Sequence, residues 1–133
     1  MKEGQAPAKD LNEISRQIVD AAIQVHKKLG PGLLESIYRE CLVYELRKRG
    51  LKVDVEVYVP IVYDGVTLSS PMRLDVLVEG EIILELKAIE AVLAVHKSQL
   101  LSYLRLTNKR LGLLLNFNVV LLKDGMFRIV NRL

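Results

Sequence analysis

Residues 72–88, MRLDVLVEGEIILELKA, constrain the fold more than any other stretch of this 133-residue chain. On both sides of Gly80 apolar residues fall at every second position, which is the period of a half-buried β-strand. The two apolar rows are Met72, Leu74, Val76 and Val78, then Ile82, Leu84, Leu86 and Ala88. Because glycine suits a tight turn, the stretch predicts a β-hairpin with its loop at residues 79–81.

The register of this hairpin decides which polar side chains meet. A three-residue loop places Asp75 opposite Glu85, and it also places Arg73 opposite Lys87. A two-residue loop would instead oppose Asp75 to Leu84 and would mix polar and apolar residues on both faces, so the pattern favours the first register. Two carboxylates this close repel each other unless a proton or a cation lies between them. The hairpin therefore predicts a divalent-metal site.

Length and composition predict a single domain. A chain of 133 residues, half of them apolar, is long enough to bury a core, so we expect one domain at 11–133. Residues 1–10, MKEGQAPAKD, lack an apolar core, so we expect a disordered tail there. The single cysteine, Cys41, excludes an internal disulfide and favours the reducing cytoplasm. No apolar run is long enough to span a bilayer, so we expect no membrane partner. The net charge of +3 is compatible with nucleic acid without requiring it.

The periodicity of the remaining chain predicts helices on both sides of a run of strands. Helical spacing indicates helices over about 11–29, 33–49 and 94–107. Asp10 and Glu13 are expected to form a capping box before the first helix. Strict alternation predicts a strand over 52–59, with Val53, Val55, Val57 and Val59 on one face. The turn pair Asp64-Gly65 between two short apolar segments predicts a small hairpin over 61–68, which precedes the central hairpin.

The C-terminal third predicts how the sheet is completed. The apolar run at 110–117 suits a strand covered on both faces. Because a helix separates it from 82–88, the two strands should be parallel through a right-handed crossover. Residues 119–122 and 126–130 are expected to form a last hairpin at an edge. The predicted fold class is therefore α/β, with a mixed central β-sheet flanked by helices.

Further polar residues are expected near the polar face of the central hairpin. Gln99 and Tyr103 are four residues apart in the third helix, so they share one of its faces. Glu35 and Tyr38 share a face near the start of the second helix. A helix that follows Lys87 closely and packs beside the hairpin can direct its polar face at the carboxylates.

Asp75, followed ten residues later by Glu85-Leu86-Lys87 and then by a helix with Gln99 and Tyr103, resembles the PD-(D/E)XK nuclease superfamily. Residues 32–38, GLLESIY, resemble the signature of its GxxExxY branch. The resemblance covers Leu11 to about Val130 and implies a restriction-endonuclease-like core in the order α-α-β-β-β-β-α-β plus a C-terminal hairpin. One departure is that leucine, not proline, precedes Asp75.

The resemblance also implies roles for individual residues. Asp75 and Glu85 would bind Mg²⁺ or Mn²⁺, with the carbonyl of Leu86 and the carboxylate of Glu35 as further ligands. Lys87 would orient or help to deprotonate the attacking water. Gln99 and Tyr103 would steady the substrate. From its place on the polar face, Arg73 could meet a phosphate or could neutralise a neighbouring acid.

Each role has a simpler structural alternative. Asp75, Glu85 and Lys87 could form an ordinary cross-strand salt-bridge cluster, and Glu35 suits the first turn of a helix in any case. Gln99 and Tyr103 could only brace their helix against the sheet. Two functions follow: a metal-dependent phosphodiesterase acting on DNA or RNA, or a non-catalytic nucleic-acid-binding or assembly module with the same fold. The exposed edge of the last hairpin could also pair with a second copy, which would make a homodimer.

Overall fold

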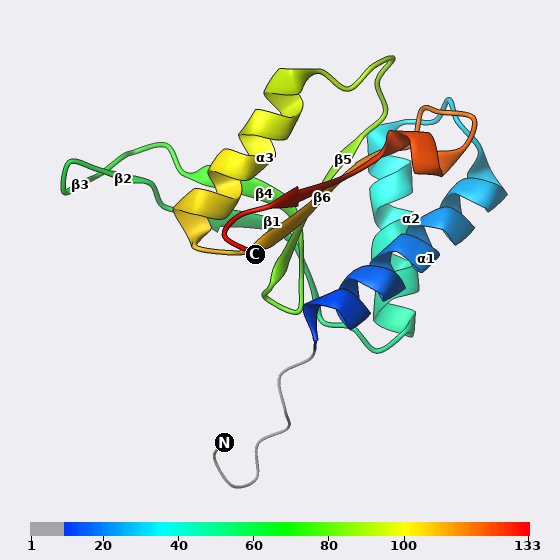
Figure 1. Ribbon diagram of the computed structural model, residues 1–133, viewed down its shortest axis with the longest axis horizontal. Coiled ribbons are helices and arrows are strands. Elements are labelled where there is room, and N and C mark those ends of the chain that lie inside the picture. The colour runs from blue at the N-terminus through cyan, green and yellow to red at the C-terminus, as the bar shows by residue number, and fades with distance from the viewer. Residues whose placement is uncertain (1–9) are drawn as a thin grey trace, which may run out of the picture.

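The computed structural model describes residues 10–133, which form three layers (Figure 1). Helices α1 (Leu11–Leu29) and α2 (Glu35–Lys48) cover one face of a central sheet, and α3 (Ala94–Thr107) covers the other. The predicted α/β class with helices on both sides of the sheet is therefore confirmed. The predicted tail lies outside the described residues except for Asp10.

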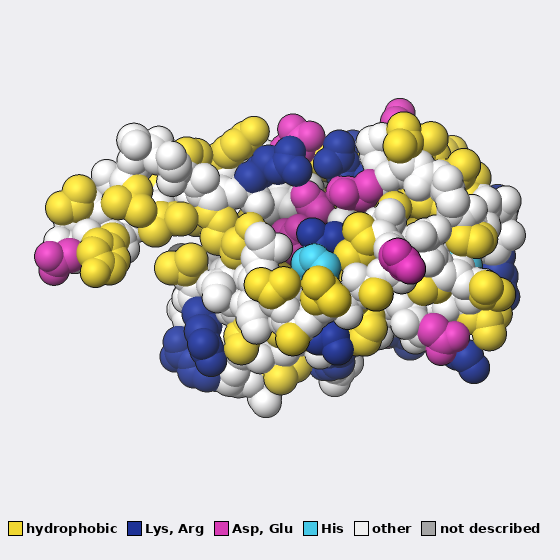
Figure 2. Space-filling model, turned by 90° about the horizontal axis from the view of Figure 1, so that it is seen from above, with side chains coloured by type: hydrophobic (Ala, Val, Ile, Leu, Met, Phe, Trp, Pro, Cys, Tyr) yellow, Lys and Arg dark blue, Asp and Glu magenta, His cyan; other side chains and the backbone are white. Residues whose placement is uncertain are grey.

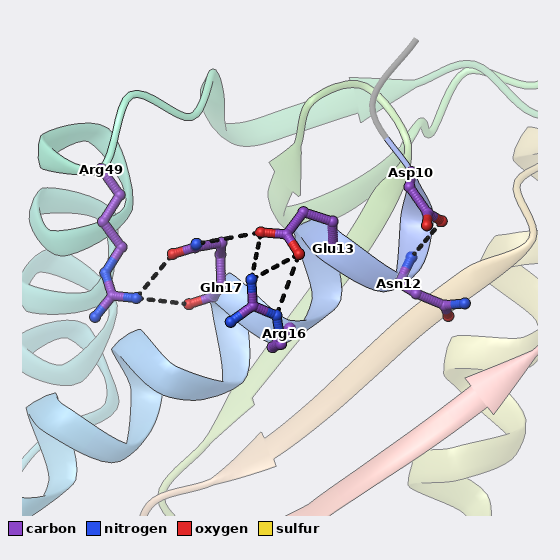
Figure 3. A network of polar contacts seen from close by, with 6 residues as sticks. All are labelled: Asp10, Asn12, Glu13, Arg16, Gln17 and Arg49. Atoms are coloured by element: carbon purple, nitrogen blue, oxygen red, sulfur yellow. Dashed lines mark hydrogen bonds and ion pairs between the residues drawn. The ribbon is translucent and has the colours of Figure 1, made fainter.

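Helix α1 has the predicted bounds but not the predicted capping box. The side chain of Asp10 accepts a hydrogen bond from the backbone N–H of Asn12 at 3.0 Å, which satisfies one free donor of the first turn (Figure 3). The carboxylate of Glu13 does not reach back to Asp10. It binds the guanidinium of Arg16 instead, at 2.6 Å, because an arginine one turn later offers a charged donor.

Helix α2 begins at Glu35, two residues later than predicted. Leu34, the residue just before the helix, has φ and ψ angles of −67° and 146°, an extended conformation that a helix cannot contain. Just beyond the last turn of α2, Arg49 donates to the side chain of Gln17 at 2.9 Å and pairs with Asp20 at 2.8 Å. The contact between Arg49 and Gln17 links the end of α2 to α1 (Figure 3).

The main sheet has five strands in the order β1-β4-β5-β6-β7. Their bounds are β1 Val53–Val59, β4 Met72–Val78, β5 Ile82–Lys87, β6 Leu111–Asn116 and β7 Met126–Val130. Strands β5 and β6 are parallel and α3 connects them, whereas the other neighbours are antiparallel. The predicted mixed sheet with a helical crossover is thus confirmed.

Strands β1 and β4 change faces midway, which the alternation of their sequences did not predict. The four residues expected in one row of β4 divide between two cores: Val76 and Val78 pack beneath α1 and α2, and Met72 and Leu74 pack beneath α3. In β1, Val53 and Val57 divide in the same way. A φ of 53° at Glu56 interrupts the alternation, and the pairing of β1 with β4 skips Glu56 and its facing residue Asp75.

The small hairpin forms as predicted. Strands β2 (Val62–Tyr63) and β3 (Val66–Thr67) pair around Asp64 and Gly65, whose φ angles of 52° and 76° suit a tight hairpin turn. The hairpin projects away from the main sheet (Figure 1). With this hairpin, five strands lie between α2 and α3 in the chain, whereas the order that the resemblance implied has four.

The C-terminal hairpin differs from the prediction, because residues 119–122 do not form a strand. β7 pairs instead with β6, and the connection contains a short 3₁₀ helix, η1 (Leu122–Gly125). Leu122 packs into the core beneath α1 and α2. Gly125 passes so close to Asn116 that a Cβ atom there would lie 2.1 Å from the carbonyl oxygen of Asn116. Burial of Leu122 thus replaces strand pairing here. No helix within residues 10–133 is both long and apolar enough to cross a bilayer.

Candidate functional site

Asp75 in β4 and Glu85 in β5 are both buried, each with 6 % of its surface exposed. Val76 pairs with Leu84, Leu77 with Ile83 and Val78 with Ile82, which is the register that the three-residue loop predicts. Continued by one step, this register brings Asp75 opposite Glu85. Buried acids are rare unless they are paired or bind a metal, so the two side chains identify the candidate site.

The hydrogen bonds of the two acids differ. Asp75 accepts from the backbone N–H of Leu86 and from the guanidinium of Arg73, in both cases at 3.2 Å. The Oε1 atom of Glu85 is buried and has no hydrogen-bond partner among the described residues. A buried polar atom without a partner requires an explanation, and an ion or a proton would supply one.

Burial, followed by the negative charge of Asp75, raises the pKa of Glu85 to about 8. Desolvation disfavours the charged form of a carboxyl group, and a second carboxylate nearby adds to that effect. Glu85 therefore binds a proton near neutral pH unless a cation takes its place. The orphaned oxygen and the raised pKa both fit a divalent cation, for which Mg²⁺ and Mn²⁺ suit the hard oxygen ligands present.

Glu35 lies at the start of α2 and interacts electrostatically with the same site. Its pKa is raised by burial first and by the charge of Asp75 second, whereas Lys87, Arg39 and Arg73 act in the opposite direction. Within residues 10–133, however, no three side chains of His, Cys, Asp or Glu are arranged so that they could hold one metal ion. The ligand role of Glu35 therefore stays a prediction.

Two further predicted residues, Lys87 in β5 and Tyr103 in α3, are linked to the acids by their electrostatic interactions. Lys87 is half-buried at the end of β5, and its charge acts on both Glu35 and Glu85. The pKa of Tyr103 in α3 is raised by burial and then by the charges of Glu85 and Asp75, so Tyr103 lies near enough to be affected by both acids. Gln99 is exposed one turn earlier on α3. Figure 2 shows acidic side chains gathered in the middle of this face, with Lys and Arg side chains and a histidine beside them.

Tyr38 has a structural position that the sequence pattern did not specify. It is fully buried, stacks on Phe117 with ring centroids 4.6 Å apart, and donates to the carbonyl of Gly30 at 2.6 Å. Its hydroxyl also accepts from the backbone N–H of Leu33 at 3.0 Å. Tyr38 therefore fixes the loop that leads into Glu35, which explains physically why a tyrosine follows this glutamate by three residues.

Two residues of the site were missed by the sequence reasoning. Arg39 follows Glu35 by four residues and so lies on the same face of α2, a spacing that could have identified it. Glu56 could not have been found, because its alternation placed it on a solvent face of β1. In the structure the two side chains pair at 3.4 Å beside Arg73.

Comparisons with known proteins agree with this fold. A family model described as "PD-(D/E)XK nuclease superfamily" matches residues 12–129. The crystal structure of a protein named SSO0001 has the same fold, with a TM-score of 0.53 and 17 % sequence identity over 98 % of this chain and 72 % of the other. No curated protein sequence matches the chain with significance.

Proposed function

The chain belongs to the PD-(D/E)XK nuclease superfamily, and from this we propose that it is a metal-dependent phosphodiesterase that hydrolyses DNA or RNA. The observation that carries the proposal is the buried oxygen of Glu85, which has no protein partner among the described residues although it lies beside a second buried acid, Asp75. An oxygen in that position is suited to a cation. We further propose that the chain acts in the cytoplasm and belongs to the GxxExxY branch.

Asp75 and Glu85 are the proposed ligands of Mg²⁺ or Mn²⁺. Glu35 and the carbonyl of Leu86 are proposed as the further ligands that the protein supplies. Two or three oxygen ligands suffice, because Mg²⁺ keeps several of its waters. A bound ion of this kind would polarise a phosphoryl oxygen and lower the pKa of bound water. The hydrogen bonds that Asp75 accepts from Arg73 and Leu86 support this role, because such bonds restrict the orientation of a ligating carboxylate.

Lys87 is the proposed group that orients the attacking water and stabilises the charge that develops on the phosphate. Its support is the action of its positive charge on Glu35 and Glu85, where it opposes the rise of both pKa values. Gln99, Tyr103 and Arg73 are the proposed substrate contacts. Tyr103 can donate a hydrogen bond from the α3 side, whereas Arg73 offers a guanidinium from the β4 side.

Cleavage of labelled single-stranded and duplex DNA and RNA tests this function. We expect cleavage with Mn²⁺ and none with chelator, and Asp75→Asn should abolish it because the ion loses a ligand. Glu81→Gln serves as the matched control, since Glu81 is exposed at the loop of the same hairpin. Binding of nucleic acid without cleavage under all conditions would favour the non-catalytic module instead.

Self-association remains a separate proposal. Strand β7 forms one edge of the sheet, and an unpaired edge can pair with a second copy. Sedimentation velocity at increasing protein concentration tests it, and a constant monomer mass would contradict it.

A further inference from the structure

Two arginines from different elements meet at one carboxylate oxygen beside the acids. The guanidinium of Arg39 on α2 lies 3.4 Å from Oε1 of Glu56, and that of Arg73 on β4 lies 3.7 Å from the same atom. Arg73 also contacts Oδ1 of Asp75 at 3.2 Å. The pair therefore places an anionic oxygen between two guanidiniums at the margin of the proposed metal site.

The position of Glu56 in β1 depends on an unusual backbone. Its φ of 53° is rare for a residue other than glycine, and strained residues of this kind gather at functional sites. Glu56 falls where the pairing of β1 with β4 skips one step, opposite Asp75. At this interruption the regular alternation of side chains along β1 is broken, and the carboxylate of Glu56 contacts the two arginines.

Stability does not account for this cluster. The side chains of Glu56 and Arg73 are 43 % and 44 % exposed, and ion pairs that are open to water contribute little to folding. Arg39 is more enclosed, with 21 % of its side chain exposed, and its guanidinium lies 3.4 Å from the carboxylate of Glu56. A partly enclosed guanidinium beside a weakly held carboxylate is suited to exchanging that carboxylate for another anion.

We propose that Arg39 and Arg73 form a phosphate clamp for the nucleic acid backbone, and that Glu56 is a built-in counter-ion which the phosphate displaces. This proposal rests on the proposed function, because the clamp lies beside the proposed metal site. Two phosphate oxygens take the place of the carboxylate of Glu56, and the paired guanidiniums hold a phosphate next to the one that is cleaved. The contact is to the backbone, so it is independent of base sequence.

The direction in which two substitutions change the affinity for nucleic acid distinguishes a clamp from a structural brace. In a clamp, Arg39→Gln removes a phosphate contact and weakens binding, whereas Glu56→Gln removes the competing anion and tightens it. In a brace, both substitutions loosen the same contact and change binding in the same direction. Lys48→Gln is the matched control, because it removes one positive charge from an exposed position on the opposite side of α2.

Fluorescence anisotropy with labelled DNA and RNA measures this, with Ca²⁺ in place of Mg²⁺ to limit cleavage. We expect Arg39→Gln to weaken binding about tenfold and to reduce the slope of log K against log salt by about one, since one phosphate contact is lost. Arg39→Lys should restore that slope but only part of the affinity, because lysine lacks the planar fork. Glu56→Gln should tighten binding severalfold, and Lys48→Gln should change it little.

Three results would overturn the clamp. Weaker binding by both Arg39→Gln and Glu56→Gln would identify a structural brace. Unchanged binding by Arg39→Gln in a protein that still cleaves nucleic acid would refute the clamp and leave the nuclease function intact. A wild-type protein that neither binds nor cleaves nucleic acid would refute both.

Discussion

Replacing Glu85 by glutamine tests the electrostatics of the candidate site without any nucleic acid. Burial, and then the charge of Asp75, raises the pKa of Glu85 from its ordinary 4.5 to about 8. In the absence of metal, the folded protein thus keeps a proton that the unfolded chain releases above its ordinary pKa. This proton contributes stability in full below the unfolded pKa, and the contribution is lost as the pH rises through the folded pKa.

The size of the effect follows from the width of that window. While the folded state is protonated and the unfolded state is ionised, the free energy of unfolding falls by up to about 1.4 kcal/mol per pH unit. From about pH 5.5 to about pH 7.5 the wild type should therefore lose roughly 2–3 kcal/mol through Glu85. Glutamine has nearly the shape of the protonated acid and does not titrate, so Glu85→Gln should lack this loss.

Urea titrations in chelator at several pH values measure the prediction. The quantity of interest is the free energy of unfolding of the wild type minus that of Glu85→Gln, which should fall as the pH rises. Glu81→Gln, at an exposed position of the same hairpin, provides the control. A difference that stays constant over this range would refute the raised pKa of Glu85. Added Mn²⁺ should stabilise the wild type more at higher pH, because the ion replaces the proton.

Three further predictions concern other parts of the site and its support. Lys87→Ala should lower the cleavage rate by about two orders of magnitude while Mn²⁺ still binds by calorimetry, and cleavage at the wild-type rate would exclude its catalytic role. Tyr38→Phe should reduce the free energy of unfolding by about 1–3 kcal/mol in urea, because the partly buried backbone groups of Gly30 and Leu33 lose their hydrogen bonds to its hydroxyl, and a change near zero would contradict this. Gly112→Ala should cost about 1–3 kcal/mol in the same assay, because its Cβ would lie 2.9 Å from a side-chain carbon of Leu100. Adding Leu100→Ala should remove the penalty of that Cβ, and an unchanged penalty would show that the collision lies elsewhere.

Periodicity predicted most of the secondary structure, because it depends on neighbours along the chain. Helices α1 and α3 have the predicted bounds, and β5 keeps its row of apolar residues beneath α1 and α2. The face change in β4 was missed, since Met72 to Val78 alternates without a break in sequence while the strand turns at Asp75. The missing strand at 119–122 has a similar cause. Leu122 is apolar enough for a strand but is buried by the 3₁₀ helix instead.

Some features of the candidate site could likewise be predicted from the sequence and others could not. The alternation of residues specifies the hairpin register and the residue types of the site, because a slip of one residue would have mixed the polar and apolar rows. The hydrogen bonds of Asp75, the desolvation of Glu85 and the contact of Arg39 with Glu56 follow instead from how distant segments pack together. Desolvation depends on which distant segments cover a side chain, and ion pairs depend on the approach of α2 to β1. Neither quantity is encoded in local periodicity, so the chemistry of these residues could be identified in sequence but their environment could not.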